Sequence, residues 1–230
     1  PSPLPWEEGT YKLQPLPFWE SPSYQQQLLQ SEVDMEVAQK ENVLANYHAL
    51  KRQISPHFLF NSLNVLDELI NEDPKRASDF LTRLSRVYRY VTRNQNVDLV
   101  TLEEELDFIK SYIYLVETRF NNNLKVHIEV QTEDLKKKIV PAALQILVEN
   151  TIKHNEISET RPLEVWVKSD STYLIIFNPI QAKMSSRRES IGVGLQNITK
   201  RYEFFIDTEV IVRNDGQSFE VKLPLLTSDK

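Results

Sequence analysis

Apolar positions change their spacing near the middle of the chain. From residue 24 to residue 70 they recur at helical spacing and form one heptad-like stripe. The stripe comprises Val33, Val37, Leu44, Tyr47, Ile54, Phe58 and Val65, and it is interrupted by Lys40, Lys51 and Asn61. Asp73 and Pro74 end this long helix, and two further helices are predicted over residues 78–93 and 102–120. Thr101, with Glu104 three residues on, is predicted to open the second of these as a capping box. The first half is therefore predicted to be a helical bundle.

The second half mixes strand and helix patterns. Strands are predicted over residues 124–131, 163–168 and 173–177, and residues 209–224 form a hairpin pattern turning at 214–216. Helices are predicted over residues 141–154 and 192–205, with a polar loop at 180–191 between them. The sequence thus predicts an α+β fold, in which a helical bundle precedes a mixed sheet with helices on one face. We expect an extended, proline-rich lead-in over residues 1–22, the helical region over 23–120 and the α/β domain over 121–230.

Composition narrows the functional classes. The 230 residues are 40% hydrophobic, and no apolar run approaches the roughly 20 residues that cross a bilayer. The absence of cysteine excludes disulfides, thiolate metal sites and a cysteine nucleophile. A net charge of -6 argues against direct nucleic-acid binding, and the locally basic run over residues 83–93 is interpreted as a solvated helix face.

His57 is the first candidate for a reactive residue. It stands in a segment, residues 53–64, that is unusually polar for an apolar helix. If Ile54 and Phe58 face a partner helix, His57 lies on the flank of that seam and is open to solvent or to another domain. A neutral imidazole nitrogen is a good nucleophile near pH 7, and Pro56 loosens the preceding turn. From these residues alone, a functional and a structural histidine both remain open.

Two later motifs suit a nucleotide. On a helix, Asn150, Lys153 and His154 share one face with Glu149 at its edge; the amide oxygen can bind Mg²⁺ and the cations can contact phosphate. A solvated helix end is the alternative interpretation, since the helix dipole favours cations there. Gly192 and Gly194 lie where a loop enters a helix, so that backbone N–H groups can approach phosphates, although a tight turn would use the same glycines.

The order of these motifs resembles that of the LytS-like sensor histidine kinases over about residues 45–224. The resemblance implies a dimerising bundle that carries His57 as phosphoacceptor, followed by an ATP-binding domain of the gyrase, Hsp90, kinase and MutL type. It implies Asn150 as the Mg²⁺ ligand, Glu149, Lys153 and His154 as its supporting set, and Gly192 and Gly194 as the phosphate-side lid hinge. It further implies a homodimer, a response regulator that receives the phosphoryl group on aspartate, and a cytoplasmic location in a parent protein anchored in the membrane ahead of this chain.

The chain departs from the family pattern at two positions. Asn178, followed by Pro179, stands where the family usually presents an Asp and a glycine-containing turn to adenine, and its amide oxygen can still accept from the adenine amine. Phe58 stands where many histidine kinases place an acid after the phosphoacceptor, so the general base is unassigned. Asn61, one turn after His57, either positions a water that removes phosphate from a partner or sets the register of the bundle.

A second class of function accounts for both departures. A catalytically inactive dimeric relay would dock a partner through its bundle and keep a degenerate nucleotide-binding domain. A serine kinase with the same ATP fold leaves the polar segment around His57 unexplained, and an ATP-driven clamp lacks room for its transducing domain. We therefore expect an ATP-dependent protein-histidine kinase, with the inactive relay as the alternative.

Overall fold

The computed structural model describes residues 26, 30, 56–182, 193–205 and 208–227. The chain divides into two compact units, Pro1–Arg52 and Gln53–Lys230. In the first unit only Gln26 and Gln30 are described, and both are helical and exposed. The predicted lead-in and most of the predicted long helix therefore lie outside the described residues, and the fold that follows is that of the second unit.

Two antiparallel helices begin the second unit. Helix α2 spans Pro56–Glu72 and helix α3 spans Pro74–Arg93. Helix α3 begins four residues earlier than predicted, because the Asp73 side chain accepts a hydrogen bond from the Arg76 amide while Pro74 occupies the first helical position. The dipeptide that ends one helix thus also starts the next.

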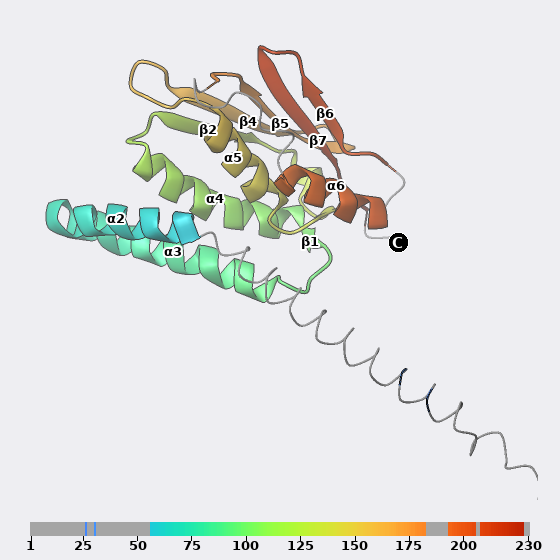
Figure 1. Ribbon diagram of the computed structural model, residues 1–230, viewed down its shortest axis with the longest axis horizontal. Helices are drawn as coiled ribbons and strands as arrows, with labels where there is room; N and C mark the ends of the chain where they lie inside the picture. The colour runs from blue at the N-terminus through green and yellow to red at the C-terminus, as the bar shows by residue number, and fades with distance from the viewer. Residues whose placement is uncertain (1–25, 27–29, 31–55, 183–192, 206–207, 228–230) are drawn as a thin grey trace, which may run out of the picture. The chain divides into compact units, whose positions relative to one another are not determined.

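Helix α4, Leu102–Arg119, lies between this helical hairpin and the sheet (Figure 1). The predicted capping box is present, since the Thr101 hydroxyl accepts from the Glu104 amide and the Glu104 carboxylate accepts from the Thr101 amide. Ten of its 18 residues are buried, as a helix packed on two sides requires.

A five-stranded sheet forms the second layer. Its strands are β2 (Leu124–Glu129), β4 (Leu163–Ser169), β5 (Tyr173–Pro179), β6 (Ile211–Asn214) and β7 (Ser218–Pro224). Their order is β2-β4-β5-β7-β6, with β2 parallel to β4 and the other neighbours antiparallel, so the predicted mixed sheet is confirmed. The predicted hairpin turns at Gly216, whose φ of 83° suits glycine. Short strands β1 (Val100–Thr101) and β3 (Lys138–Ile139) form a separate antiparallel pair that the sequence did not predict, and η2 (Thr132–Asp134) is a single 3-10 turn.

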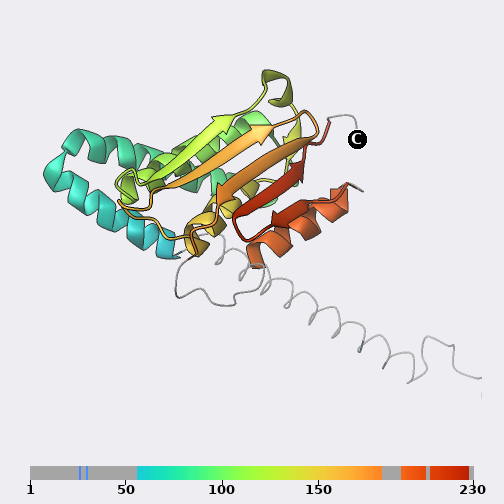
Figure 2. The same ribbon diagram turned by 90° about the horizontal axis from the view of Figure 1, so that it is seen from above.

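Helices α5 (Ala143–His154) and α6 (Val193–Phe205) lie with α4 on one face of the sheet (Figures 1 and 2). Helix α5 begins two residues later than predicted, because Ala142 adopts a left-handed conformation with φ of 60°. Alternate residues of β4 face this helical layer, and those side chains complete the core: Leu163, Val165 and Val167. The predicted α+β architecture, with helices on one face of a mixed sheet, is confirmed.

The described part of the apolar stripe packs against the same chain. The ring of Phe58 stacks on that of Tyr112 in α4, with 5.1 Å between the ring centroids. Val65 also packs against the core of the same chain. The reason is that α4 needs an apolar cover on the side away from the sheet, and α2 supplies it. The boundary near residue 120 stays a prediction.

Candidate active site

Helix α5 carries the polar set that the sequence singled out, and the start of α6 lies against it. A Cβ atom added to Gly194 would stand 2.9 Å from the Ile146 Cγ2 atom and 4.0 Å from the Asn150 amide nitrogen. Only a residue without a side chain therefore allows this approach of the two helices. The arrangement brings the amide of Asn150 to the N-terminal end of α6, where backbone N–H groups and the helix dipole favour an anion.

His57 lies close to the same helix from another direction. Its neighbour Phe58 stacks on Tyr112, while the His57 side chain itself is exposed. Burial raises the pKa of Glu149, and electrostatic interactions with His57 and Lys153 oppose that rise. The negative charge of Glu149 in turn adds to the effect of burial in raising the pKa of Tyr112. The Glu149 carboxylate on α5 thus interacts electrostatically with His57 on α2 and with Tyr112 on α4.

Asn178 is buried at the end of β5, beneath α5. Its side-chain oxygen accepts a hydrogen bond from the Thr151 hydroxyl at 3.1 Å, and its side-chain nitrogen donates to the Pro179 carbonyl at 2.8 Å. The Thr151 hydroxyl also lies 3.1 Å from the Leu147 carbonyl. The amide proposed to meet adenine is therefore held in one orientation by its neighbours, with one amide hydrogen and one oxygen lone pair left for a ligand.

The C-terminal end of α5 is tied to the segment after β5. The Asn155 side-chain nitrogen donates to the Thr151 carbonyl at 2.9 Å, and its oxygen accepts from the Gln181 amide at 2.6 Å. The Glu156 amide donates to the Gln181 carbonyl at 2.7 Å. These bonds fix the last turn of α5, which carries Lys153 and His154.

The N-terminal end of α5 is held by a residue of α4. Glu105, which is fully buried, accepts hydrogen bonds from the Ala142 amide at 3.0 Å, the Leu144 amide at 3.1 Å and the Tyr90 hydroxyl at 2.5 Å. Helix α5 has no side-chain cap of its own at Ala142. The Glu105 carboxylate therefore satisfies the open N–H groups of a helix that lies elsewhere in the sequence.

Glu105 should make stability depend on pH. Burial raises its pKa from 4.5 to about 7, although the donated hydrogen bonds and the charge of Arg201 oppose the rise. Between these two values the folded protein keeps a proton that the unfolded chain has lost, so the free energy of unfolding falls as pH rises from 4.5 to about 7. A Glu105→Gln variant cannot titrate there and should lack this decline, which is on the order of 3 kcal/mol over the full interval.

Urea unfolding of both proteins at pH 5 and pH 7.5 measures this difference. All other side chains are the same in the two proteins, and the hydrogen bonds altered by glutamine add a nearly constant offset, so the difference in pH dependence isolates Glu105. If the free energy of unfolding declined equally with pH in the wild type and the variant, the decline could not be assigned to Glu105.

The remaining predicted site residues are distributed as follows. Lys153 is exposed and His154 is half-buried, both in the last turn of α5. Asn61 is half-buried on α2, and its side-chain nitrogen has no hydrogen-bond partner within the described part of the chain. Gly192 lies outside the described residues. The two roles considered for Asn61 both stay predictions.

Sequence reasoning missed Glu105, Tyr90, Thr151 and Asn155. A signal for Glu105 was present, because a charged residue three positions after Leu102 and four before Ile109 falls on the apolar face of α4. Tyr90 and Thr151 carried no such signal, since their partners are distant in sequence.

Comparisons with known proteins agree with the motifs. Residues 45–124 match the family model described as histidine kinase. The sensor protein LytS of Enterococcus faecalis is 27% identical over 192 residues, which are 76% of this chain and 33% of LytS. The sensor protein kinase HptS of Staphylococcus aureus is 37% identical over 152 residues, 64% of this chain and 29% of HptS. The chain thus spans about a third of the length of the curated relatives it matches.

A solved structure, the cytoplasmic segment of the histidine kinase QseC, covers 66% of this chain and 93% of its own, with 18% identity. Its TM-score of 0.42 is too low to carry a conclusion. The family match, in contrast, contains His57 and runs through α2, α3 and α4. The matched family and the named relatives confirm the resemblance of this chain to the LytS-like sensor histidine kinases.

Proposed function

We propose that this chain is the cytoplasmic catalytic part of a membrane-anchored sensor histidine kinase, which phosphorylates its own His57 from ATP and passes the phosphoryl group to an aspartate of a response regulator. One observation carries the proposal: two groups of residues come together on helix α5. His57 interacts electrostatically with Glu149, and Gly194 at the start of α6 lies close to Asn150. In the described part of the chain no helix is long and apolar enough to cross a bilayer.

The residues around α5 fit a nucleotide. The N-terminal end of α6 and the cation of Lys153 offer favourable surroundings for phosphate oxygens, and the Asn150 amide offers a hard oxygen. No cluster of three His, Asp or Glu residues that could hold a metal occurs in the described ranges, so Asn150 would share Mg²⁺ with the phosphates. Mg²⁺, when bound, offsets negative charge that develops on the transferred group. Asn178, with Thr151 behind it, would meet the adenine amine.

Glu149 fills the role of general base that the sequence left open. One ring nitrogen of His57 attacks the γ-phosphorus as the bond to the ADP oxygen breaks, and the proton on the other ring nitrogen passes to the Glu149 carboxylate. Burial raises the pKa of Glu149, which makes it a stronger base than an ordinary carboxylate. The products are ADP and a phosphohistidine, whose phosphoryl group then moves to the partner's aspartate.

Incubating the purified chain with Mg²⁺ and γ-labelled ATP tests this function. We expect label on the protein that is lost in acid and kept in alkali, as a phosphoramidate bond should be, together with nucleotide binding by calorimetry. Acid-stable label would indicate phosphorylation of a hydroxyl group and would overturn the histidine assignment.

An inactive relay remains the second candidate, favoured by one observation. The amide of Asn178 is already bonded to Thr151 and Pro179, which leaves only one amide hydrogen and one oxygen lone pair for adenine. In that case no nucleotide binds, and an Asn150→Ala variant of the full-length receptor supports wild-type phosphorylation of the response regulator. Loss of regulator phosphorylation in that variant would exclude the relay.

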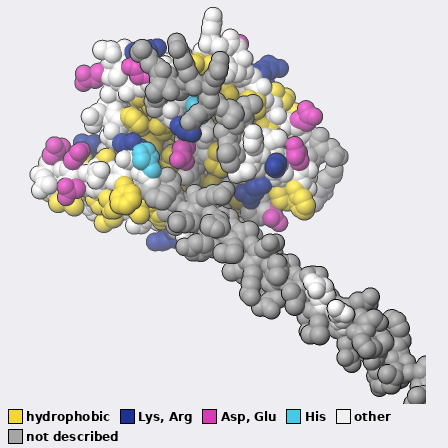
Figure 3. All heavy atoms as spheres, viewed as in Figure 1, with side chains coloured by type: hydrophobic (Ala, Val, Ile, Leu, Met, Phe, Trp, Pro, Cys, Tyr) yellow, Lys and Arg dark blue, Asp and Glu magenta, His cyan; other side chains and the backbone are white. Residues whose placement is uncertain are grey.

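The homodimer is supported by an exposed apolar stripe on α2. Phe60 is 66% exposed, Leu63 46% and Ile70 55%, and they recur at helical spacing on the side away from the core. Hydrophobic side chains gather over α2 in Figure 3. A second copy of α2 would cover this stripe, with His57 at the edge of the contact.

A Phe60→Asp, Leu63→Asp double variant should therefore shift the chain from dimer to monomer by more than about tenfold in dissociation constant, because two carboxylates would lie in an apolar contact. Sedimentation equilibrium measures the shift. The matched control is Leu81→Asp, 50% exposed on α3, which should leave the dimer intact. An unchanged dimer in the double variant would contradict this interface.

A further inference from the structure

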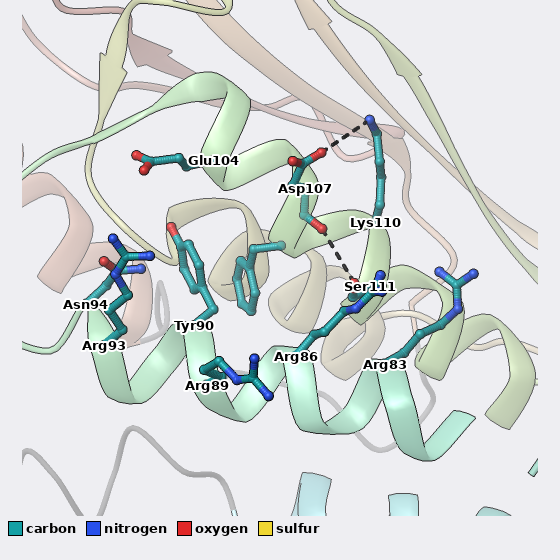
Figure 4. Close-up of a pocket in the computed structure, with 11 residues that line it drawn as sticks. Arg83, Arg86, Arg89, Tyr90, Arg93, Asn94, Glu104, Asp107, Lys110 and Ser111 are labelled. Carbon is teal, nitrogen blue, oxygen red and sulfur yellow. Dashed lines mark hydrogen bonds and ion pairs between the residues drawn. The ribbon is translucent and has the colours of Figure 1, made fainter. Parts of the chain in front are cut away.

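A groove of about 550 Å³ runs between α3 and α4, on residues that the nucleotide site does not use (Figure 4). Four arginines of α3 line it at intervals of three or four residues, and a lysine of α4 lines it as well: Arg83, Arg86, Arg89, Arg93 and Lys110. Two carboxylates, Glu104 and Asp107, lie on the α4 side. The groove is thus strongly basic in a chain whose net charge is -6.

Within the part of the chain that the structure describes, three of the groove's cations have no ion-pair partner. Asp107 lies 3.9 Å from the Lys110 amine, and Asp79, outside the groove, lies 3.2 Å from the Arg83 guanidinium. Glu104 is occupied by the Thr101 capping box. Among the described residues, no carboxylate lies within 4.0 Å of the guanidinium groups of the other three arginines, Arg86, Arg89 and Arg93.

The wall between these arginines is rigid. The Tyr90 ring lies parallel to that of Phe108, with 4.0 Å between centroids and 9° between planes. The Tyr90 hydroxyl is bonded to the buried Glu105 carboxylate. Because the surface is already ordered, a ligand would lose little free energy in organising it.

The volume and the donors define the class of ligand. Pockets for small molecules commonly measure 300–1,000 Å³, whereas a protein segment is usually bound on a larger, flatter surface. Guanidinium groups bind phosphate oxygens through paired N–H donors. We propose that the α3–α4 groove is a binding site for a small ligand that carries several phosphate groups, separate from the nucleotide site on α5.

The test is calorimetric titration of the full chain with inorganic tripolyphosphate at fixed ionic strength. We expect saturable binding that survives in a Lys153→Ala variant, which weakens the nucleotide site. An Arg86→Gln, Arg89→Gln, Arg93→Gln variant should bind more than about tenfold more weakly. These arginines are exposed, so the variant should keep its thermal unfolding midpoint.

A control with the same change in charge is available. Lys75, Arg76 and Lys125 are exposed and lie outside the groove, and a variant with glutamine at all three positions should bind as the wild type does. Equal weakening in both triple variants would show a general charge effect and overturn the site, as would absence of binding to the wild type. If a hexaglutamate peptide bound more tightly than tripolyphosphate, the groove would be a site for an acidic protein segment. That result would overturn the proposal of a small ligand with several phosphate groups.

Discussion

A His57→Gln variant is expected to take up no label from γ-labelled ATP. Glutamine keeps a polar side chain at the exposed start of α2 but has no nucleophilic ring nitrogen, so the phosphoryl group has no acceptor. Phe58 should still stack on Tyr112, and nucleotide binding should remain as in the wild type. Gel separation of the labelled proteins, with calorimetry for nucleotide affinity, measures both quantities.

His127 provides the matched control for this variant. It is exposed on β2, where its ring lies 5.5 Å from that of Trp166, so it belongs to the sheet and not to the surroundings of α5. The His127→Gln protein should be labelled as the wild type is. Label that persists in the His57→Gln protein would assign the phosphoryl group to another residue.

A Glu149→Gln variant should slow autophosphorylation by roughly 10²–10⁴-fold, the usual contribution of a positioned base. The amide keeps the shape of the side chain but cannot take a proton from His57. Burial raises the pKa of Glu149, so the wild-type rate should keep increasing up to a higher pH than it would with an ordinary carboxylate as the base. The variant should lose this pH-dependent increase in rate. Single-turnover rates of both proteins, taken across the pH range at saturating nucleotide, measure the loss of rate and the change in its pH dependence.

Glu156 is the matched control, because it lies just beyond the C-cap residue of α5, Asn155, and is paired with Arg161 at 2.8 Å. A Glu156→Gln protein should keep the wild-type rate. If Glu149→Gln phosphorylates itself at the wild-type rate while binding nucleotide, the proton of His57 leaves by another route.

The sequence was sufficient for the elements whose causes are local. Alternation predicted the sheet strands, the capping box at Thr101 predicted the start of α4, and the turn at Gly216 predicted the last hairpin. What the sequence leaves open depends on tertiary packing. Phe58 satisfies a helical period whether its partner is another copy or α4 of the same chain, and only the packed structure distinguishes the two.

The candidate site was predictable in its residue types but not in its assembly. Spacing on one helix grouped Glu149, Asn150 and Lys153, since helical neighbours are fixed by geometry. No such rule relates His57 to Glu149, because they lie on different helices with α4 beside both. The close approach of Gly194 to α5 was equally unpredictable, because a glycine in a sequence does not reveal which surface it packs against.

The bonds from Glu105 to the Ala142 and Leu144 amides also bear on how relatives of this chain can diverge. Helix α5 depends on a carboxylate encoded almost forty positions upstream, so a substitution at position 105 alters the helix of the candidate site without changing any recognised motif. A lineage that loses this acid needs a new acceptor just before Ala143 if the helix is to keep its first turn. Mutation and compensation at these two places should therefore be inherited together.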